Sequence, residues 1–190
     1  MAGLPGVGRT LGGAWVVDAR LGQGGMGAVF RVRRVGTGEP GALKLLLPGE
    51  DDPGARAEAA RRLRDEGTAA SRIRHPNLVA VLATGEDEKY GPFVVYELLP
   101  GTSLRDRLSA DGPLPSWDAV MEKVARPLLA GLAALHDAGV VHRDLKPENL
   151  FESADGSLKV GDLGQSVDAR VRSACSLDVG VGAEELSGKL

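Results

Sequence analysis

Strand-type and helix-type patterns are segregated along this 190-residue chain. Residues 14–47 alternate apolar and polar side chains in three short runs separated by glycine-rich turns, which predicts an antiparallel meander. Two more strands are expected at Leu78–Ala83 and Phe93–Leu98. Pro100 and Gly101 then interrupt the chain, and helix and loop patterns dominate beyond them. This segregation predicts an α+β protein with two lobes joined near Pro100.

Two long segments carry the apolar spacing of a helix. The first helix is expected over residues 55–74, where apolar side chains recur every three or four positions. The carboxylate of Glu66 falls on the same apolar face and therefore needs a partner. The second helix is expected from Trp117 to Ala138. Pro127 lies inside this segment and should kink the helix or shift its boundary.

We expect four parts along the chain. Residues 1–13 are predicted to be a flexible, glycine-rich leader, because a glycine-rich terminus has little to fix it. Residues 14–98 form a first lobe and residues 99–164 a second lobe. Residues 165–190 form an atypical tail, since this stretch contains neither proline nor an aromatic residue.

The composition narrows the classes of function. The chain has 23 Lys and Arg against 26 Asp and Glu, a formal charge of −3, which excludes a globally basic nucleic-acid binder. The single cysteine, Cys175, excludes an intramolecular disulfide framework and a cysteine-rich zinc site. No apolar run approaches the ~20 residues that cross a bilayer, and the N-terminus lacks the apolar core of a signal peptide. We therefore expect a soluble, cytoplasmic protein.

A glycine-rich segment, Gly22–Val29, fits the pattern G-x-G-x-x-G-x-V between two predicted strands. Glycines allow backbone N–H groups to approach phosphate oxygens without obstruction by a Cβ atom. A simple glycine-rich hairpin turn explains this segment equally well when it is taken alone. The element that follows is a strand, which argues against a dinucleotide site of the type that needs a helix N-terminus for its pyrophosphate.

Lys44 occupies the middle of an otherwise apolar strand. A lysine flanked by buried positions is costly unless it is paired or bound to a ligand, although a lysine on an edge strand can also extend its amine to solvent. Glu66, on the apolar face of the first helix, is the natural partner. Each of these two charges explains the other.

Charged and polar residues cluster at His142–Asn149, between apolar neighbours. A core histidine is the default interpretation of His142 alone, but it does not account for the Arg, Asp, Lys and Asn that surround it. An Asp-x-Gly sequence, Asp162–Gly164, follows after a short predicted strand. An ordinary turn aspartate is the alternative interpretation of Asp162.

Taken in order, these motifs resemble the signature set of the protein kinases. The amino-acid sequences at Gly24–Gly27 and His75-Pro76-Asn77 are most similar to those of the bacterial, eukaryotic-like (Hanks-type) serine/threonine protein kinases. The resemblance covers residues 14–164. It implies a two-lobed kinase fold. The first lobe would be a five-stranded antiparallel sheet with one helix, and the second an incomplete, mainly helical lobe.

The resemblance also implies ATP, Mg²⁺ and a protein Ser/Thr substrate. Asp144 would accept the proton of the substrate hydroxyl, and Lys146 would steady the γ-phosphate. Asn149 and Asp162 would hold Mg²⁺ through oxygen atoms. Lys44, held by Glu66, would neutralise the α- and β-phosphates. The backbone covering the phosphates would come from the glycine loop, namely Leu21, Gly22, Gln23, Gly24, Gly25, Met26 and Gly27.

By the same resemblance, the adenine would lie between the lobes. Val29 and Ala42 would contact it from above, and Phe151 would form the floor. Tyr96 would occupy the gatekeeper position. The hinge, Glu97–Leu99, would hydrogen-bond the adenine edge, while His142 and Arg143 would be scaffold residues.

The resemblance weakens after Gly164. Leu163 replaces the usual Phe, and the Ala-Pro-Glu motif is absent from residues 165–190, so we expect a C-terminally truncated kinase domain whose exposed helix is covered by a second copy or a partner. The leading function is an ATP-dependent serine/threonine protein kinase. The alternative is a pseudokinase-like module that binds nucleotide, or a partner, without phosphoryl transfer. A small-molecule kinase of related fold is less favoured, because the glycine loop and Lys146 are complete.

Overall fold

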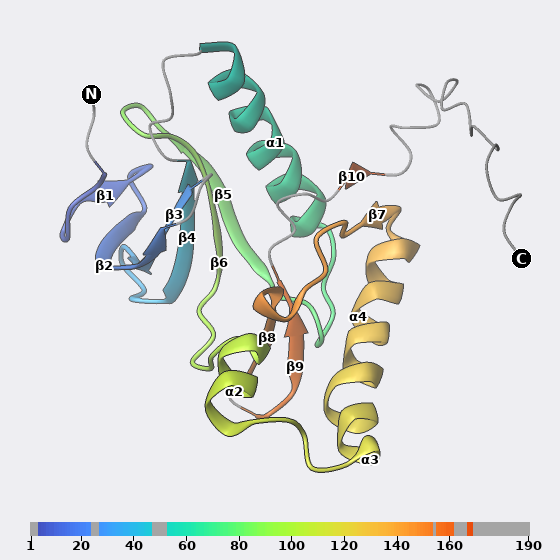
Figure 1. The fold of residues 1–190 in the computed structure, drawn as a ribbon. Helices are drawn as coiled ribbons and strands as arrows, with labels where there is room; N and C mark the ends of the chain where they lie inside the picture. The colour runs from blue at the N-terminus through green and yellow to red at the C-terminus, as the bar shows by residue number, and fades with distance from the viewer. Residues whose placement is uncertain (1–3, 24–26, 47–52, 154, 162–166, 169–190) are drawn as a thin grey trace, which may run out of the picture.

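The computed structural model describes residues 4–23, 27–46, 53–153, 155–161 and 167–168. Strands gather in the first part of the chain and helices in the second, so the segregation read from the sequence is present in space (Figure 1). Helix α1 (Pro53–Ser71) packs on the sheet of the first lobe. Within the described residues, no helix is both long and apolar enough to cross a membrane.

The first lobe is one antiparallel sheet of six strands in the order β1-β2-β3-β4-β6-β5. Its strands are β1 (Thr10–Leu11), β2 (Trp15–Gln23), β3 (Gly27–Arg34), β4 (Pro40–Leu46), β5 (Val81–Asp87) and β6 (Gly91–Glu97). Along β3 and β4, Ala28, Phe30, Val32, Leu43 and Leu45 are buried in the core. The intervening side chains must face the opposite way, because successive residues of a strand alternate between the two faces. This opposite face carries Lys44.

Strand β1, which the sequence did not predict, lies within the segment that we expected to be a flexible leader. That expectation is wrong for Thr10–Leu11. These two residues pair with β2, and the Leu11 side chain is fully buried in the core of the first lobe. The N–H of Gly12 also donates to Asp87 Oδ2 at 3.2 Å, which ties this segment to the end of β5. Two residues are too short to show strand alternation, so the sequence carried no signal of this strand.

Strand β5 begins at Val81, three residues later than the sequence predicted. Leu78 and Val79 instead run beside β9 (Leu158–Val160) of the second lobe, where the Val79 N–H donates to the Val160 carbonyl at 2.9 Å. The Asn77 amide adds a bond to the Leu158 carbonyl at 2.9 Å. The segment after α1 therefore joins the two lobes through hydrogen bonds to the backbone of β9.

Helix α1 lies close to the sheet because it carries a glycine at the contact. A Cβ atom on Gly67 would lie 2.7 Å from Thr84 Cγ2 and 2.8 Å from Val94 Cγ2, so a larger residue would push the helix away. Leu63 and Ala70 are buried on the same side of the helix. The neighbouring Glu66 is consequently carried into the lobe rather than to solvent.

The second lobe begins with α2 (Leu104–Asp111), which Ser103 caps by accepting a hydrogen bond from the Asp106 N–H. The predicted long helix is continuous but contains a π-helical turn: α3 (Trp117–Val120), η1 (Met121–Ala125) and α4 (Arg126–Asp137). This turn ends at Ala125, two residues before Pro127, which lacks the N–H that a regular helix needs there. The remaining elements are β7 (Val140–Val141), the 3₁₀ turn η2 (Pro147–Asn149), β8 (Leu150–Glu152), β9 and β10 (Val167–Asp168).

Candidate functional site

Lys44 and Glu66 meet beneath the sheet of the first lobe. Lys44 Nζ lies 3.3 Å from Glu66 Oε1 and 3.4 Å from Oε2. The Glu66 side chain is only 3% exposed and that of Lys44 is 22% exposed. A carboxylate this buried is tolerated because a cation lies beside it. The pairing expected from the sequence is therefore present.

Tyr96 adds a contact that the sequence did not reveal. Its hydroxyl donates to Glu66 Oε1, so the carboxylate is held from β4 by Lys44 and from β6 by Tyr96. Tyr96 pairs directly with Ala42 across the two strands, and Ala42 lies two residues from Lys44. Directly opposite residues, and residues two apart, point to the same face of a sheet. Ala42, Lys44 and Tyr96 therefore share the face that α1 approaches.

We expect Tyr96→Phe to lower the free energy of unfolding by about 1.5–3 kcal/mol, because it removes a hydrogen bond to a buried charged group and no carbon atom. Chemical denaturation of the two proteins measures this difference. Tyr90→Phe is the matched control, since the Tyr90 hydroxyl makes no hydrogen bond within the described part of the chain. Equal losses in the two variants would contradict a specific role for the Tyr96 hydroxyl.

The loop between β7 and β8 carries the second group of predicted site residues. His142 is buried; its Nε2 donates to the Gly161 carbonyl at 2.9 Å, and its Nδ1 accepts from the Asp144 N–H at 3.3 Å. A carbonyl can only accept and a backbone N–H can only donate, so these two bonds assign the ring proton to Nε2. His142 thereby links this loop to the residue that follows β9.

Asp144 is held from two sides. Lys146 Nζ lies 2.7 Å from Asp144 Oδ2, and Asn149 Nδ2 donates to Asp144 Oδ2 at 3.2 Å and to its carbonyl at 2.8 Å. The hydrogen bond from Lys146, ahead of any other contact, keeps the pKa of the Asp144 carboxyl below its usual value. The carboxylate is therefore ionised at neutral pH and remains so to lower pH than an isolated aspartate.

Arg143 has a left-handed backbone, with φ of 64°, and is the one described residue other than glycine with a positive φ. This conformation costs a residue with a side chain roughly 1–2 kcal/mol. It lies between His142 and Asp144, whose contacts are made on either side of it. Strain of this kind persists where neighbouring interactions fix the backbone, as they do here.

Asn149 is suited to holding a hard cation. Its side chain is buried and its Nδ2 is committed to Asp144, which leaves the amide oxygen as an available ligand atom. Amide and carboxylate oxygens are ligands that Mg²⁺ accepts. Asp162, its expected partner, lies outside the described residues. Within the described part of the chain, no group of three or more His, Cys, Asp or Glu side chains forms a metal site.

The glycine loop is described on both sides of Gly24, Gly25 and Met26, which lie outside the described residues. Leu21, Gly22 and Gln23 close β2, and Gly22 pairs with Val29 of β3. Gly27 opens β3, where a Cβ atom would lie 2.5 Å from the Leu45 carbonyl oxygen. Glycine is thus required at Gly27 by the packing of the sheet as well as by the motif.

The predicted adenine-contacting residues come from both lobes. Val29 lies opposite Lys44, so it shares the face of Ala42 and Tyr96. Phe151 lies in β8 of the second lobe, and a Cβ atom on Gly161 would approach its ring to 3.0 Å. Leu99 is half-buried in the connection between the lobes.

One ion pair near the hinge was missed by the sequence analysis. Lys159 Nζ lies 2.7 Å from Glu97 Oε1. Lys159 lies between the buried Leu158 and Val160 in a short strand. This is the same signal, a lysine in an apolar strand, that singled out Lys44, and it could have identified Lys159 as well.

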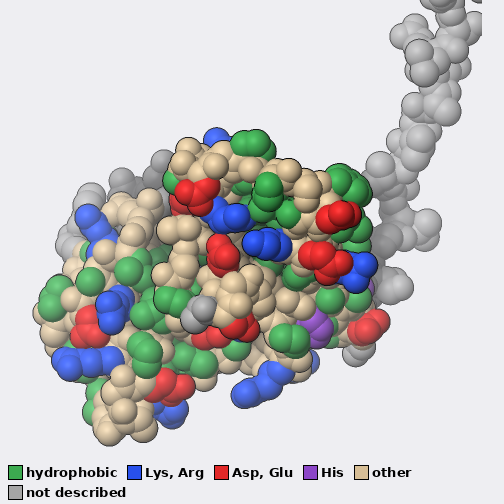
Figure 2. All heavy atoms as spheres, turned by 90° about the horizontal axis from the view of Figure 1, so that it is seen from below, with side chains coloured by type: hydrophobic (Ala, Val, Ile, Leu, Met, Phe, Trp, Pro, Cys, Tyr) green, Lys and Arg blue, Asp and Glu red, His purple; other side chains and the backbone are tan. Residues whose placement is uncertain are grey.

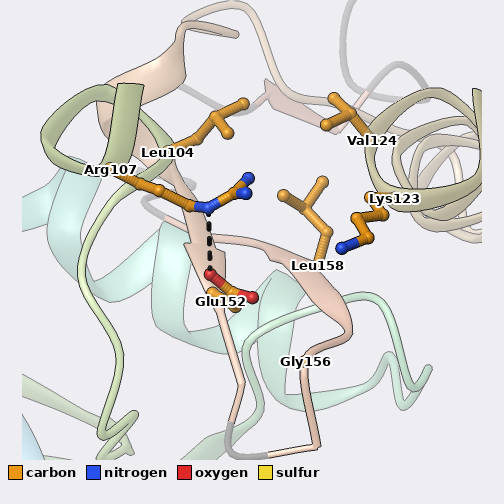
Figure 3. Close-up of a pocket in the computed structure, with 7 residues that line it drawn as sticks. All are labelled: Leu104, Arg107, Lys123, Val124, Glu152, Gly156 and Leu158. Carbon is orange, nitrogen blue, oxygen red and sulfur yellow. Dashed lines mark ion pairs between the residues drawn. The ribbon is translucent and has the colours of Figure 1, made fainter. Parts of the chain in front are cut away.

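The second lobe also contains a hollow outside this group of residues. None of the predicted site residues lines it; its wall includes the Arg107–Glu152 ion pair at 3.8 Å, which ties α2 to β8 (Figure 3). Seen from below, the molecule shows Lys and Arg side chains interspersed with Asp and Glu (Figure 2). This hollow therefore lies outside the candidate functional site.

A curled antiparallel sheet with one helix, a Lys–Glu pair beneath it and an Asp–Lys–Asn cluster in the loop below define the architecture of the protein kinases. The family's sequence model, described as the protein kinase domain, matches residues 15–185, and the chain belongs to this family. The α+β, two-lobed fold expected from the sequence is thereby confirmed, with six strands in the first-lobe sheet instead of five.

The curated relatives include bacterial serine/threonine-protein kinases. The chain is 40% identical over 150 residues to PknL of Mycobacterium tuberculosis, covering 79% of this chain and 36% of the relative. It is 37% identical over 148 residues to pkn3 of Myxococcus xanthus, covering 76% and 26%. It is 36% identical over 152 residues to the probable PknB of Corynebacterium glutamicum, covering 78% and 23%. The chain thus spans about a third or less of the length of these relatives.

Proposed function

We propose that this chain binds ATP and transfers its γ-phosphate to a serine or threonine hydroxyl of a protein. The observation that carries the proposal is the coexistence of two intact groups: the Lys44–Glu66 pair, and Asp144 with its partners Lys146 and Asn149. The names of the bacterial relatives support the choice of serine and threonine as the acceptors. A requirement for ATP also favours the cytoplasm as the place where it acts.

Nucleotide binding is assigned mainly to the face of the sheet that carries Lys44. Val29 and Ala42 provide an apolar surface for the adenine, with Phe151 opposite them in the second lobe and the Glu97–Leu99 backbone at its edge. Lys44 places one positive charge where the α- and β-phosphates would lie. Glu66, which is itself held by the Tyr96 hydroxyl, fixes the Lys44 amine, so that little ordering of the lysine side chain is needed when the phosphates arrive.

Transfer is assigned to the loop between β7 and β8. The substrate hydroxyl oxygen forms a bond to the γ-phosphorus as the bond from that phosphorus to the ADP oxygen breaks, and the hydroxyl proton passes to the Asp144 carboxylate. Lys146 keeps this carboxylate ionised and offers its charge to the transferred phosphoryl group. Mg²⁺, when bound by Asn149 and Asp162, would neutralise phosphate charge.

The alternative is a binding module that holds nucleotide without transferring phosphate. Calorimetric titration with ADP, with and without Mg²⁺, separates the possibilities at their first step. We expect saturable binding of one ADP that Mg²⁺ strengthens, because Asn149 and Asp162 would act through the metal. An absence of ADP binding to the folded chain would contradict both the kinase and the nucleotide-binding alternative. Binding without any phosphoryl transfer would favour the alternative.

A further inference from the structure

The carboxylate of Glu97 receives two hydrogen bonds at the end of β6. Its Oε1 atom accepts from Lys159 Nζ at 2.7 Å and from the Ala80 N–H at 2.8 Å. The Glu97 N–H in turn donates to the Ala80 carbonyl at 2.9 Å. One side chain thus joins three segments: the end of β6, the residue before β5, and β9.

This ion pair is unusual in its burial. The Glu97 and Lys159 side chains are 27% and 15% exposed. Among the ion pairs whose two partners are both described residues, only this pair and Lys44–Glu66 have both side chains less than one-third exposed. Exposed pairs contribute little, whereas breaking a largely buried pair leaves a charge without compensation. Separating the Glu97 and Lys159 side chains is therefore energetically costly, which favours the paired geometry.

The two partners belong to opposite sides of the proposed nucleotide site. Glu97 begins the hinge that connects the lobes. Lys159 pairs directly with Phe151 across the β8–β9 hairpin, and Phe151 is the proposed floor of the adenine pocket. The ion pair consequently spans from the hinge to the strand that supports the floor.

Strand β9 also connects to the transfer residues. It leads into Gly161, whose N–H donates to the Asn149 carbonyl at 2.9 Å and whose carbonyl accepts from His142. A displacement of β9 would therefore reach the floor, Asn149 and the Asp144 loop together. The side chains of Glu97 and Lys159 need not contact the nucleotide or the protein substrate for such a displacement to affect the site.

We propose that Glu97 and Lys159 form a positioning pair that fixes the separation between the hinge and the floor of the nucleotide site. Lys159 acts through β9 and Phe151, and Glu97 acts through the backbone of the hinge. This inference rests on the proposed nucleotide site for its functional consequence. Its structural part, the coupling of the hinge to the hairpin, does not.

The structural part is tested first, without nucleotide, by amide hydrogen exchange on the full chain. We expect Lys159→Met to raise exchange at least fivefold in both the hinge and the β8–β9 hairpin, and Lys159→Arg to restore protection in both. The control is Arg64→Met, which breaks the exposed Arg64–Glu86 pair between α1 and β5 and should leave both segments unchanged. Unchanged exchange in Lys159→Met, or faster exchange in only one of the two segments, would overturn the proposal.

The functional part is tested by the dissociation constant of ADP. We expect Lys159→Met to weaken ADP binding about tenfold, with Lys159→Arg within about threefold of the wild type. Glu97→Gln/Lys159→Met should bind ADP no more weakly than Lys159→Met alone, because the two residues act as one unit. Additive losses, or wild-type ADP affinity in Lys159→Met, would overturn the positioning role. Failure of the wild-type chain to bind ADP would contradict the proposed function instead, while the exchange experiment still decides the coupling.

If Lys159→Met does not fold, Glu97→Gln carries both tests. Its amide oxygen can still accept from the Ala80 N–H, so only the charge opposite Lys159 is lost. The expected result is again faster exchange in the hinge and the hairpin together and weaker ADP binding. Wild-type behaviour of Glu97→Gln in both measurements would overturn the proposal.

Discussion

Asp144→Asn is expected to lower the rate of phosphoryl transfer by about 10²–10⁴-fold, the range that a positioned general base supplies. The substitution keeps the shape of the side chain and leaves an oxygen that can still accept hydrogen bonds from Lys146 and Asn149. It removes the negative charge that receives the proton. ADP affinity should stay within a few fold of the wild type, because this carboxylate is assigned no role in holding the adenine or the α- and β-phosphates.

Asp155→Asn is the matched control for this prediction. Asp155 is an exposed aspartate in the β8–β9 turn, where Ser157 holds the pKa of the carboxyl below its usual value through hydrogen bonds. Asp155 and Asp144 therefore both have a lowered carboxyl pKa, but Asp155 lies outside the loop between β7 and β8. A similar loss of transfer in both variants would show that the effect of Asp144→Asn is not specific to the loop between β7 and β8.

Lys44→Met is expected to lower transfer by about 10²–10³-fold, comparable to the loss of one preorganised group that stabilises developing charge. It should also weaken ADP binding, since the charge assigned to the α- and β-phosphates disappears. The variant leaves Glu66 buried with Tyr96 but without the Lys44 amine, so the free energy of unfolding should fall by about 3–5 kcal/mol. Transfer rates, ADP titration and chemical denaturation measure the three quantities.

The double variant Lys44→Met/Glu66→Gln separates the loss of stability from the loss of function. Glu66→Gln neutralises the charge left by the first substitution, while its amide oxygen can still accept from the Tyr96 hydroxyl. We expect the double variant to recover much of the stability and none of the transfer. Recovery of transfer along with stability would indicate that Lys44 acts only through the fold.

The sequence predicted a contact best where a charged residue lies among apolar neighbours and therefore needs a partner of opposite charge. Lys44 in an apolar strand and Glu66 on an apolar helix face each demanded a partner, and the two side chains lie together. For this pair a local rule and the tertiary structure agree. Pro127 was expected to kink the second long helix or shift its boundary, and the helix instead stays continuous with a π-helical turn that ends two residues before Pro127.

The features that were not predicted depend on contacts between distant segments. Leu11 belongs to a two-residue strand whose pairing with β2 has no periodicity to detect. Leu78 carried a strand-type pattern, yet it pairs with Val160 of β9 and not with β6. The bond from Tyr96 to Glu66 joins residues 30 positions apart, and that from Lys159 to Glu97 joins residues 62 apart. The spacing of residues along the chain does not reveal which of these distant side chains come into contact.

The most direct test of the central claim is transfer of labelled phosphate from γ-labelled ATP, with Mg²⁺, to serine- and threonine-containing peptides by the wild-type chain and by Asp144→Asn. We expect label on serine or threonine with the wild type, and a loss of at least a hundredfold with Asp144→Asn while ADP affinity is retained. Bound ADP with no labelled peptide in either protein, or equal labelling by the two, would contradict the assignment of phosphoryl transfer to this site.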